Sequence, residues 1–218
     1  MTQDQAMEIE RETQGQANTT TWHEERRQRI TASNFGRFMT RKVAVNEAFL
    51  TSVFRAKPFS SAATSYGSCN EKVARQLYSK KTNYHVHDCG LVINPAFPFL
   101  GASPDGKVCD DGNCGILEIK CPFSLRDKKL DDAVNSGGSN LFLERREGRL
   151  ALKHSHVYWY QVQGQLLITN AQFCDFVTFT RCDLNIERIE PHPETQTLIL
   201  QKLTDIYVKH VKPFLSSP

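Results

Sequence analysis

The sequence predicts a mixed α/β fold of the α+β type, in which helices flank a central mixed β-sheet. Two observations carry this prediction. Apolar residues first recur at the three-to-four-residue spacing of helices, as far as about residue 78. Short alternating runs, separated by Asn-Pro, Pro-Asp-Gly and Asp-Gly-Asn turns, then follow between residues 89 and 121. The length of 218 residues suits one domain, which we expect to span residues 21–214.

The N-terminal part is expected to be helical after a short tail. Residues 1–20 are polar and rich in Gln and Thr, which predicts a disordered or loosely helical acidic tail. Residues 22–41 predict two short helices, with Ser33 as the N-cap of the second. Residues 43–57 predict another helix, which Pro58 ends.

The next helix is amphipathic and leads into the strands. Within residues 66–78, Cys69, Val73 and Leu77 recur at i, i+4 and i+8, with Ala74 and Tyr78 alongside, so we expect this apolar stripe to face the core. The pattern that follows predicts strands at 89–93, 97–102, 107–109 and 115–121. A loop at 136–139 and a hairpin of 141–143 with 150–152 come next. The C-terminal part predicts a helix at 156–169, a strand at 173–179 and a helix at 195–211 with Leu198, Leu203 and Ile206 inward.

The composition excludes several classes of protein. Hydrophobic residues make up 39% of the chain and charged residues 23%, which is ordinary for a globular domain and excludes a wholly disordered chain. No stretch approaches the ~18 consecutive apolar residues of a membrane span, and the sequence starts without the apolar core of a secretion signal. We therefore expect a soluble intracellular protein, nuclear or cytoplasmic, whose seven cysteines are reduced.

Positive charge is concentrated next to the acidic tail. The net charge is only +3, but residues 22–42 hold six bases against two acids, whereas residues 1–20 hold four acids and one base. A basic block of this kind indicates a polyanionic partner, although a solvated helix face is the commoner reason for a charge run.

The residues that indicate chemistry are Asp105, in a tight turn, and the strand that follows it. Side-chain alternation places Glu118 and Lys120 on one face of this strand and Ile119 on the other. An antiparallel neighbour brings Asp105 beside them. Two carboxylates and a lysine at a sheet edge are the groups that metal-assisted phosphodiester hydrolysis needs, because hard oxygen ligands hold Mg²⁺ or Mn²⁺ and the metal activates water. The alternative is a surface hairpin with its polar residues in solvent.

Two other segments offer polar groups. Glu71 lies in the helix of residues 66–78, on the side away from Cys69, and can supply a third carboxylate. The helix of residues 156–169 carries Gln161 and Gln163 among aromatic residues, and such groups can position phosphate and stack on bases. The alternatives are an exposed glutamate and an ordinary core helix.

Together these motifs resemble a known nuclease family. Ser-Pro-Asp-Gly at 103–106 and Leu-Glu-Ile-Lys-Cys-Pro at 117–122 resemble the signature of the PD-(D/E)XK nucleases, in their lambda-exonuclease/YqaJ branch, and the long segment 121–158 is more like the YqaJ-type domains of eukaryotic chains. Residues 22–33, 67–74 and 160–166 resemble further motifs of that branch in the same order. The resemblance covers roughly residues 20–210 and implies a restriction-endonuclease-like core.

The resemblance also implies residue roles, all of them expectations at this point. The matched positions are the metal ligands Glu71, Asp105, Glu118 and the backbone carbonyl of Ile119, the catalytic residues Lys120 and Gln161, and the 5′-phosphate or DNA contacts Arg26, Ser33, Ser103, Arg37 and Gln163.

The implied function is that of a Mg²⁺-dependent deoxyribonuclease, with Mn²⁺ as a substitute, that degrades DNA from its ends in the 5′→3′ direction during recombination or repair. Implied partners are single- or double-stranded DNA, further copies of the chain (lambda-type members form trimers) and a single-strand-annealing protein. A single-strand-specific exonuclease, an endonuclease of the same fold and a non-catalytic DNA-binding module remain as alternatives.

A structural zinc site is the less favoured interpretation of the His and Cys residues between 85 and 121. The spacing lacks the Cys-x₂-Cys knuckle of such sites, so buried thiols and ordinary polar histidines are expected for His85, His87, Cys89, Cys109, Cys114 and Cys121.

Overall fold

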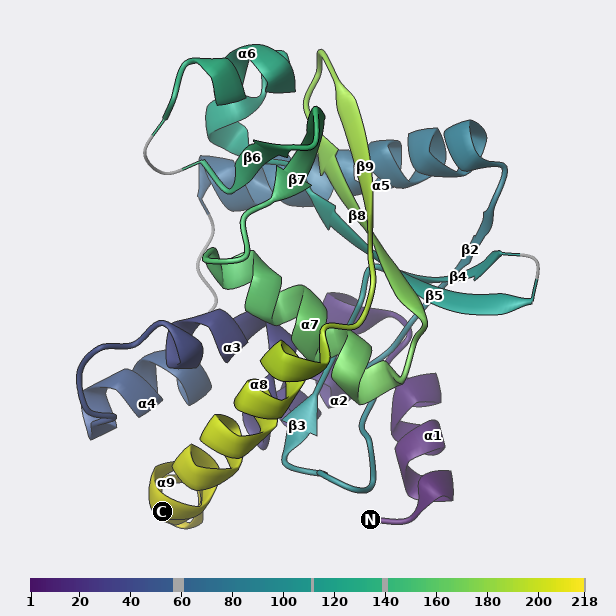
Figure 1. The fold of residues 1–218 in the computed structure, drawn as a ribbon. Coiled ribbons are helices and arrows are strands. Elements are labelled where there is room, and N and C mark those ends of the chain that lie inside the picture. The colour runs from purple at the N-terminus through teal and green to yellow at the C-terminus, as the bar shows by residue number, and fades with distance from the viewer. Residues whose placement is uncertain (57–60, 111, 139–140, 218) are drawn as a thin grey trace.

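A computed structural model describes residues 1–56, 61–110, 112–138 and 141–217 (Figure 1). Its helices are α1 (Gln3–Glu12), α2 (Thr20–Arg27), α3 (Ala32–Met39), α4 (Glu47–Phe54), α5 (Ala62–Thr82), α6 (Leu130–Asn135), α7 (Val157–Thr169), α8 (Pro193–Ile206) and α9 (Lys212–Ser216), with 3₁₀ turns at Gln16–Asn18 and Phe123–Leu125 and a π-helical turn at Tyr207–Val211. Its strands are β1 (Ile30–Thr31), β2 (His85–His87), β3 (Leu100–Gly101), β4 (Gly106–Asp110), β5 (Asn113–Lys120), β6 (Leu143–Arg146), β7 (Arg149–Leu152), β8 (Phe173–Phe179) and β9 (Leu184–Ile189).

The central sheet is mixed, as predicted. Within the described residues it contains five strands in the order β2-β4-β5-β8-β9. Strand β5 is antiparallel to β4 and parallel to β8, and β9 returns antiparallel to β8. Strand β8 is buried at every position, as its mostly apolar sequence predicts, and its two polar residues Asp175 and Thr178 are buried too. Strand β5 is buried from Gly115 to Ile119 and emerges at Lys120, so its last residues lead from the core to the surface.

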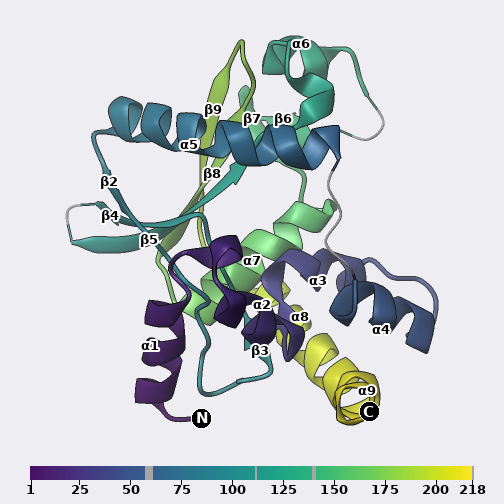
Figure 2. The same cartoon turned by 180° about the vertical axis from the view of Figure 1, so that it is seen from behind.

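Helices cover both faces of this sheet. Helix α5 packs on the face that carries Leu117 and Ile119, and Figure 2 shows it running along that face. Helix α7 packs on the face that carries Ile116, together with residues of α6 and of the β6–β7 hairpin. The alternation along β5 is therefore the one that the sequence predicts, and it directs Glu118 toward α7.

Two glycines allow α3 to approach α7 very closely. A Cβ atom on Gly36 would lie 2.4 Å from Cβ of Val157, and one on Gly164 would lie 2.3 Å from the ring of Phe35. Only glycine fits these positions without displacement of a neighbour. The contact fixes α3, which lies within the basic segment 22–42, against the helix that faces Glu118.

Residues 1–20 are not a loose tail. Helix α1 begins with a capping box at Thr2, and Ala6 is 3% exposed, in a small cluster with Leu91. The hydroxyl of Thr13 accepts a hydrogen bond of 2.7 Å from the backbone N–H of Leu91. Small and polar residues make these contacts, which explains why no apolar period predicts them.

Helix α5 buries only one side of the predicted apolar stripe. Ala74 and Tyr78 are fully buried against the sheet, whereas Val73 and Leu77 are 44% and 40% exposed and Cys69 is also exposed. Ala74 and Tyr78, at one side of the predicted stripe, make the core contact, and its central residues do not.

Some predicted strands are absent from the described residues, and the observed strands β1, β2 and β9 were not predicted. Segments 89–93 and 97–102 form a loop with one bridge between Val92 and Ala102 and the short strand β3, since Pro95 and Pro98 donate no ladder hydrogen bonds. Strands β1 and β2 have only two and three residues, and β9 mixes Leu184, Ile186 and Ile189 with polar residues, so its apolar pattern is weak.

Three further predictions concern the inward face of α8 and the ends of two segments. Helix α8 buries Leu203 and Ile206, but Leu198 is 51% exposed. The predicted end of the 43–57 helix at Pro58, and the last residue of the 136–139 loop, lie outside the described residues.

Candidate active site

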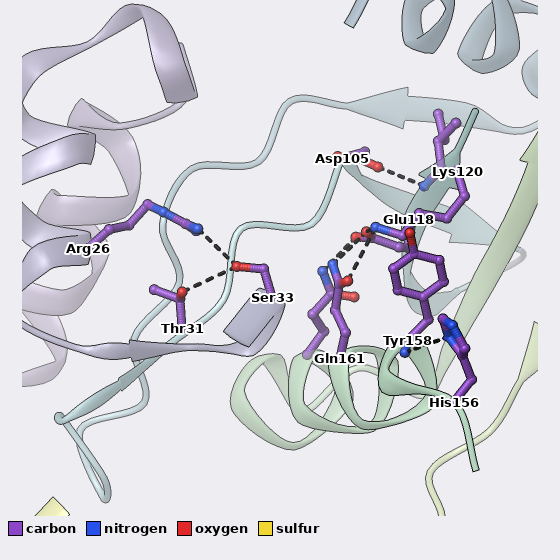
Figure 3. A network of polar contacts seen from close by, with 11 residues as sticks. Arg26, Thr31, Ser33, Asp105, Glu118, Lys120, His156, Tyr158 and Gln161 are labelled. Atoms are coloured by element: carbon purple, nitrogen blue, oxygen red, sulfur yellow. Dashed lines mark hydrogen bonds and ion pairs between the residues drawn. The ribbon is translucent and has the colours of Figure 1, made fainter. Parts of the chain in front are cut away.

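Asp105 lies beside the outgoing end of β5, one residue before β4 begins. Its backbone N–H donates to the carbonyl of Leu117 at 2.9 Å, which continues the β4–β5 pairing. Its Oδ2 accepts a hydrogen bond of 2.7 Å from the backbone N–H of Ile119. The turn and the strand register therefore place the Asp105 carboxylate between the backbone positions of Glu118 and Lys120 (Figure 3).

Glu118 is 3% exposed and is held by three donors. Its Oε1 accepts from Lys120 Nζ at 2.5 Å and from Gln161 Nε2 at 2.6 Å, and its Oε2 accepts from Gln165 Nε2 at 2.6 Å. The Lys120 ammonium also donates to Gln161 Oε1 at 3.2 Å and lies 4.6 Å from the ring centroid of Tyr158. The carboxylate is thus oriented by one cation of its own strand and by two amides of α7.

The two glutamines at this carboxylate are not the pair that the sequence predicts. Gln161 and Gln165 are one helical turn apart and share the face of α7 toward Glu118. Gln163 lies on another face, is fully buried, and bonds the carbonyl of Glu190 and the backbone N–H of His192. The Gln163 amide is therefore engaged inside the fold and its expected DNA contact stays a prediction, whereas the i, i+4 rule is the signal that identifies Gln165.

Glu71 reaches the same end of β5 from α5. A cleft of about 400 Å³ is lined by Glu71, Lys120, Tyr158 and the nearby Gly67 and Ser68. Helices α5 and α7 cover opposite faces of the sheet. Residues from both helices can therefore contact one ligand at the C-terminal end of β5, where this strand emerges.

Charge and burial perturb the protonation of this cluster. Burial, together with the charges of Glu118 and Glu71, raises the pKa of Asp105 well above its ordinary value. Reduced hydration and the charge of Glu118 also raise the pKa of Glu71. Burial alone would lower the pKa of Lys120, but the charges of Glu118 and Asp105 outweigh it and raise that pKa. Lys120 is therefore a cation at neutral pH, and it faces an excess of negative charge.

The donors suit a divalent cation by their chemistry. Carboxylate oxygens of Glu71, Asp105 and Glu118 are the hard ligands that Mg²⁺ prefers, and a doubly charged ion relieves the repulsion that raises the pKa values of Asp105 and Glu71. Across the described ranges, no three His, Cys, Asp or Glu side chains lie close enough to hold an ion as they stand. Glu118 is turned onto Lys120 and α7, so holding an ion requires it to exchange one of these contacts.

A second polar group lies on the N-terminal side of this site. Arg26 donates to Ser33 Oγ at 3.0 Å and to Ser103 Oγ at 3.4 Å, and its guanidinium stacks over the ring of Trp22 at 4.2 Å. The Trp22 indole N–H donates to the same Ser103 hydroxyl at 3.0 Å. Ser33 does not cap α3, because Thr31 is the N-cap; its hydroxyl is left for Arg26.

No carboxylate within the described part of the chain forms an ion pair with Arg26. The neighbouring acid Glu25 is bound by Arg29 at 2.5 Å instead. Burial lowers the pKa of Arg26 to about 10, although the charge of Glu118 opposes this shift. The Arg26 guanidinium is thus a partly buried cation with unused hydrogen-bond donors. It lies close enough to Glu118 for the charge of that carboxylate to affect its pKa.

Comparison with known proteins gives the family. Residues 21–172 match the YqaJ-like viral recombinase domain. The chain belongs to this family. Over 105 residues the YqaJ-like domain is 33% identical to an alkaline nuclease of Orgyia pseudotsugata multicapsid polyhedrosis virus, and over 120 residues it is 31% identical to an uncharacterised protein of Acanthamoeba polyphaga mimivirus. These matches cover 42% and 51% of this chain but only 24% and 19% of the viral proteins, so the YqaJ-like chain spans a small part of their length.

A solved structure agrees over nearly the whole YqaJ-like domain. The alkaline exonuclease of Laribacter hongkongensis superposes with a TM-score of 0.69 at 25% sequence identity, and the match covers 90% of this chain and 94% of that one. The mixed sheet flanked by helices is therefore the fold of that exonuclease. The same bacterial enzyme has also been solved with dAMP.

Another expected DNA contact of the YqaJ-like domain, Arg37, lies outside these groups. Arg37 donates to the hydroxyl of Ser52 in α4 at 2.8 Å and to its backbone carbonyl at 3.3 Å. The expectation that the His and Cys residues between 85 and 121 form no zinc site stays a prediction. Of the thiols in question, Cys109 and Cys114 are exposed and not buried as expected.

The structure also bears on membranes. No helix in the described ranges is both long enough and apolar enough to span a bilayer.

Proposed function

We propose that this YqaJ-like domain is a divalent-metal-dependent nuclease that degrades DNA from its ends in the 5′→3′ direction. The observation that carries the proposal is the meeting of Asp105, Glu118 and Lys120 at the end of β5, with the cation Arg26 on one side and Glu71 on the other. The sequence identity of 33% to a viral alkaline nuclease and of 25% to a bacterial alkaline exonuclease supports the proposal.

In this proposal Glu71, Asp105 and Glu118 hold Mg²⁺ or Mn²⁺, and the Ile119 carbonyl is a further oxygen at the same position. When bound, the metal polarises the scissile phosphate and makes an attacking hydroxide available at neutral pH. Lys120, which stays protonated beside Glu118, offsets the negative charge that builds up on the phosphate oxygens. Gln161 contacts both Glu118 and Lys120 and so holds the carboxylate and the ammonium in a fixed relative position.

The direction of degradation is supported by the Arg26 group. A terminal phosphate carries two negative charges and accepts several hydrogen bonds, which the guanidinium and the hydroxyls of Ser33 and Ser103 can supply. Cleavage that leaves each new phosphate on the 5′ end of the remaining strand regenerates the same recognition element. A 5′-terminal nucleotide bound there directs the next phosphodiester bond toward the carboxylates.

The proposal is tested by digestion of labelled DNA with matched ends. Linear duplexes with a 5′-phosphate or a 5′-hydroxyl, the corresponding single strands and a closed circular plasmid are incubated with the protein and Mg²⁺. We expect 5′-mononucleotides from linear DNA, faster release from phosphorylated ends, and no cutting of the circle. Nicking of the circle identifies an endonuclease, digestion of single strands alone identifies a single-strand-specific exonuclease, and binding without hydrolysis identifies a non-catalytic module.

A further inference from the structure

Gln165 makes a contact that none of the predicted site residues makes. It lies one turn beyond Gln161 on α7 and is 1% exposed. Its Nε2 donates at 2.6 Å to Oε2 of Glu118, whereas Lys120 and Gln161 both donate to Oε1. It is the one donor to Oε2 of this carboxylate among the described residues.

The orientation of the Gln165 amide follows from the charge of Glu118. If the amide were reversed, its carbonyl oxygen would face a carboxylate oxygen, and both atoms are acceptors. In the orientation observed, Oε1 of Gln165 is buried and has no hydrogen-bond partner within the described residues. A buried acceptor without a partner destabilises a folded protein, and an apolar side chain of the same size avoids that cost.

We propose that Gln165 is a positioning residue, which fixes Oε2 of Glu118 and so sets the plane of the carboxylate for the metal. The inference rests on the proposed function, because it assigns Glu118 as a metal ligand. A carboxylate held at one oxygen only can rotate about its terminal bond. The bond from Gln165 restricts that rotation even when Lys120 and Gln161 exchange their contacts with Oε1 for other partners.

Gln163 offers a matched control for the test. It has the same side chain, lies two residues away on α7 and is fully buried. It bonds the carbonyl of Glu190 and the N–H of His192, so Gln163→Met removes buried hydrogen bonds without touching Glu118. Methionine preserves the volume of the side chain in both variants.

The experiment compares wild type, Gln165→Met and Gln163→Met by calorimetric titration with Mn²⁺, by the Mg²⁺ concentration for half-maximal hydrolysis, and by DNA affinity in Ca²⁺. Loss of a residue that orients a metal ligand typically weakens metal binding by about 10–100-fold. We expect Gln165→Met to show a loss of this order in Mn²⁺ affinity, with unchanged DNA affinity. Gln163→Met should melt at a lower temperature yet bind Mn²⁺ as wild type does.

Equal Mn²⁺ affinity in wild type and Gln165→Met overturns the inference, while an active wild type leaves the proposed function intact. A wild type that neither binds Mn²⁺ nor hydrolyses DNA overturns the proposed function itself. If Gln165→Met does not fold, Gln165→Asn replaces it, because an amide shorter by one methylene cannot span the same distance to Glu118. A folded Gln165→Asn with wild-type Mn²⁺ affinity also overturns the inference.

Discussion

The Lys120 ammonium donates to Oε1 of Glu118 at 2.5 Å, and the two residues are two positions apart on the same face of β5. Glu118 is buried, and Lys120 is at the point where the strand emerges. The carboxylate of Glu118 and its counter-ion Lys120 therefore lie together near the end of β5, next to Asp105.

Replacement of Lys120 by alanine should slow hydrolysis without abolishing DNA binding. The ammonium offsets charge that develops on the phosphate, and loss of one such donor typically costs about 10²–10³-fold in kcat. Single-turnover digestion and a binding assay in Ca²⁺ measure the two effects separately. Lys107→Ala is the control, because Lys107 on β4 pairs with Glu10 of α1. A Lys120→Ala enzyme within a few fold of wild type removes this role from the lysine.

Replacement of Arg26 by alanine should equalise the digestion rates of 5′-phosphorylated and 5′-hydroxyl ends. The guanidinium bridges Ser33 and Ser103 and has no carboxylate partner in the described residues, so it is the group available to a phosphate dianion. Arg27→Ala is the matched control, because Arg27 is the next residue and is exposed. The assignment fails if Arg26→Ala keeps the wild-type preference for phosphorylated ends, or if Arg27→Ala loses it.

Replacement of Asp105 by asparagine should stabilise the metal-free protein at neutral pH while it abolishes hydrolysis. Burial and two neighbouring carboxylates raise the pKa of Asp105 in the folded protein above its value in the unfolded chain. For an acid shifted in this direction, ionisation disfavours the folded state, so the penalty is absent below the unfolded pKa and complete above the folded one. Asparagine keeps an oxygen to accept from the N–H of Ile119.

Thermal unfolding in chelator measures this effect. The variant should melt above wild type at neutral pH, and the difference should vanish below about pH 4, where Asp is protonated in both states. A lower melting temperature for Asp105→Asn at neutral pH contradicts the charge repulsion at this site.

Replacement of Gly36 by alanine should separate α3 from α7. The added methyl group meets the backbone and Cβ of Val157, neither of which can rotate away. Such overpacking typically costs about 1–3 kcal/mol of unfolding free energy. Gly67→Ala is the control, since a Cβ on Gly67 in α5 has no neighbour within 4 Å. Chemical denaturation of both variants measures the difference, and equal stability means that α3 shifts freely.

The sequence is informative where a signal is local. The turn at Asp105 and the period of two in residues 115–121 predict which side chains share a face, and the β5 register agrees. The helical period likewise separates Gln161 from Gln163, and strict use of it identifies Gln165 as well.

Tertiary contacts decide the features that the sequence does not predict. Helix α1 is held by Ala6 and Thr13 against a loop far along the chain, and α5 turns Tyr78 inward because its hydroxyl bonds the buried Asp175 at 2.6 Å. Strand β9 pairs with β8 through its backbone, and Ile189 alone among its side chains is buried. No local period records any of these contacts.

The central claim is that Asp105 and Glu118 hold a divalent metal that hydrolyses DNA. It is tested most directly by mononucleotide release from uniformly labelled, 5′-phosphorylated linear duplex, measured across a Mg²⁺ titration and in excess chelator. Wild type, Asp105→Ala and Glu118→Gln are compared. We expect release that rises with Mg²⁺ in wild type and no release in chelator or from either variant. Full release in chelator, or wild-type release from Asp105→Ala, would contradict the account.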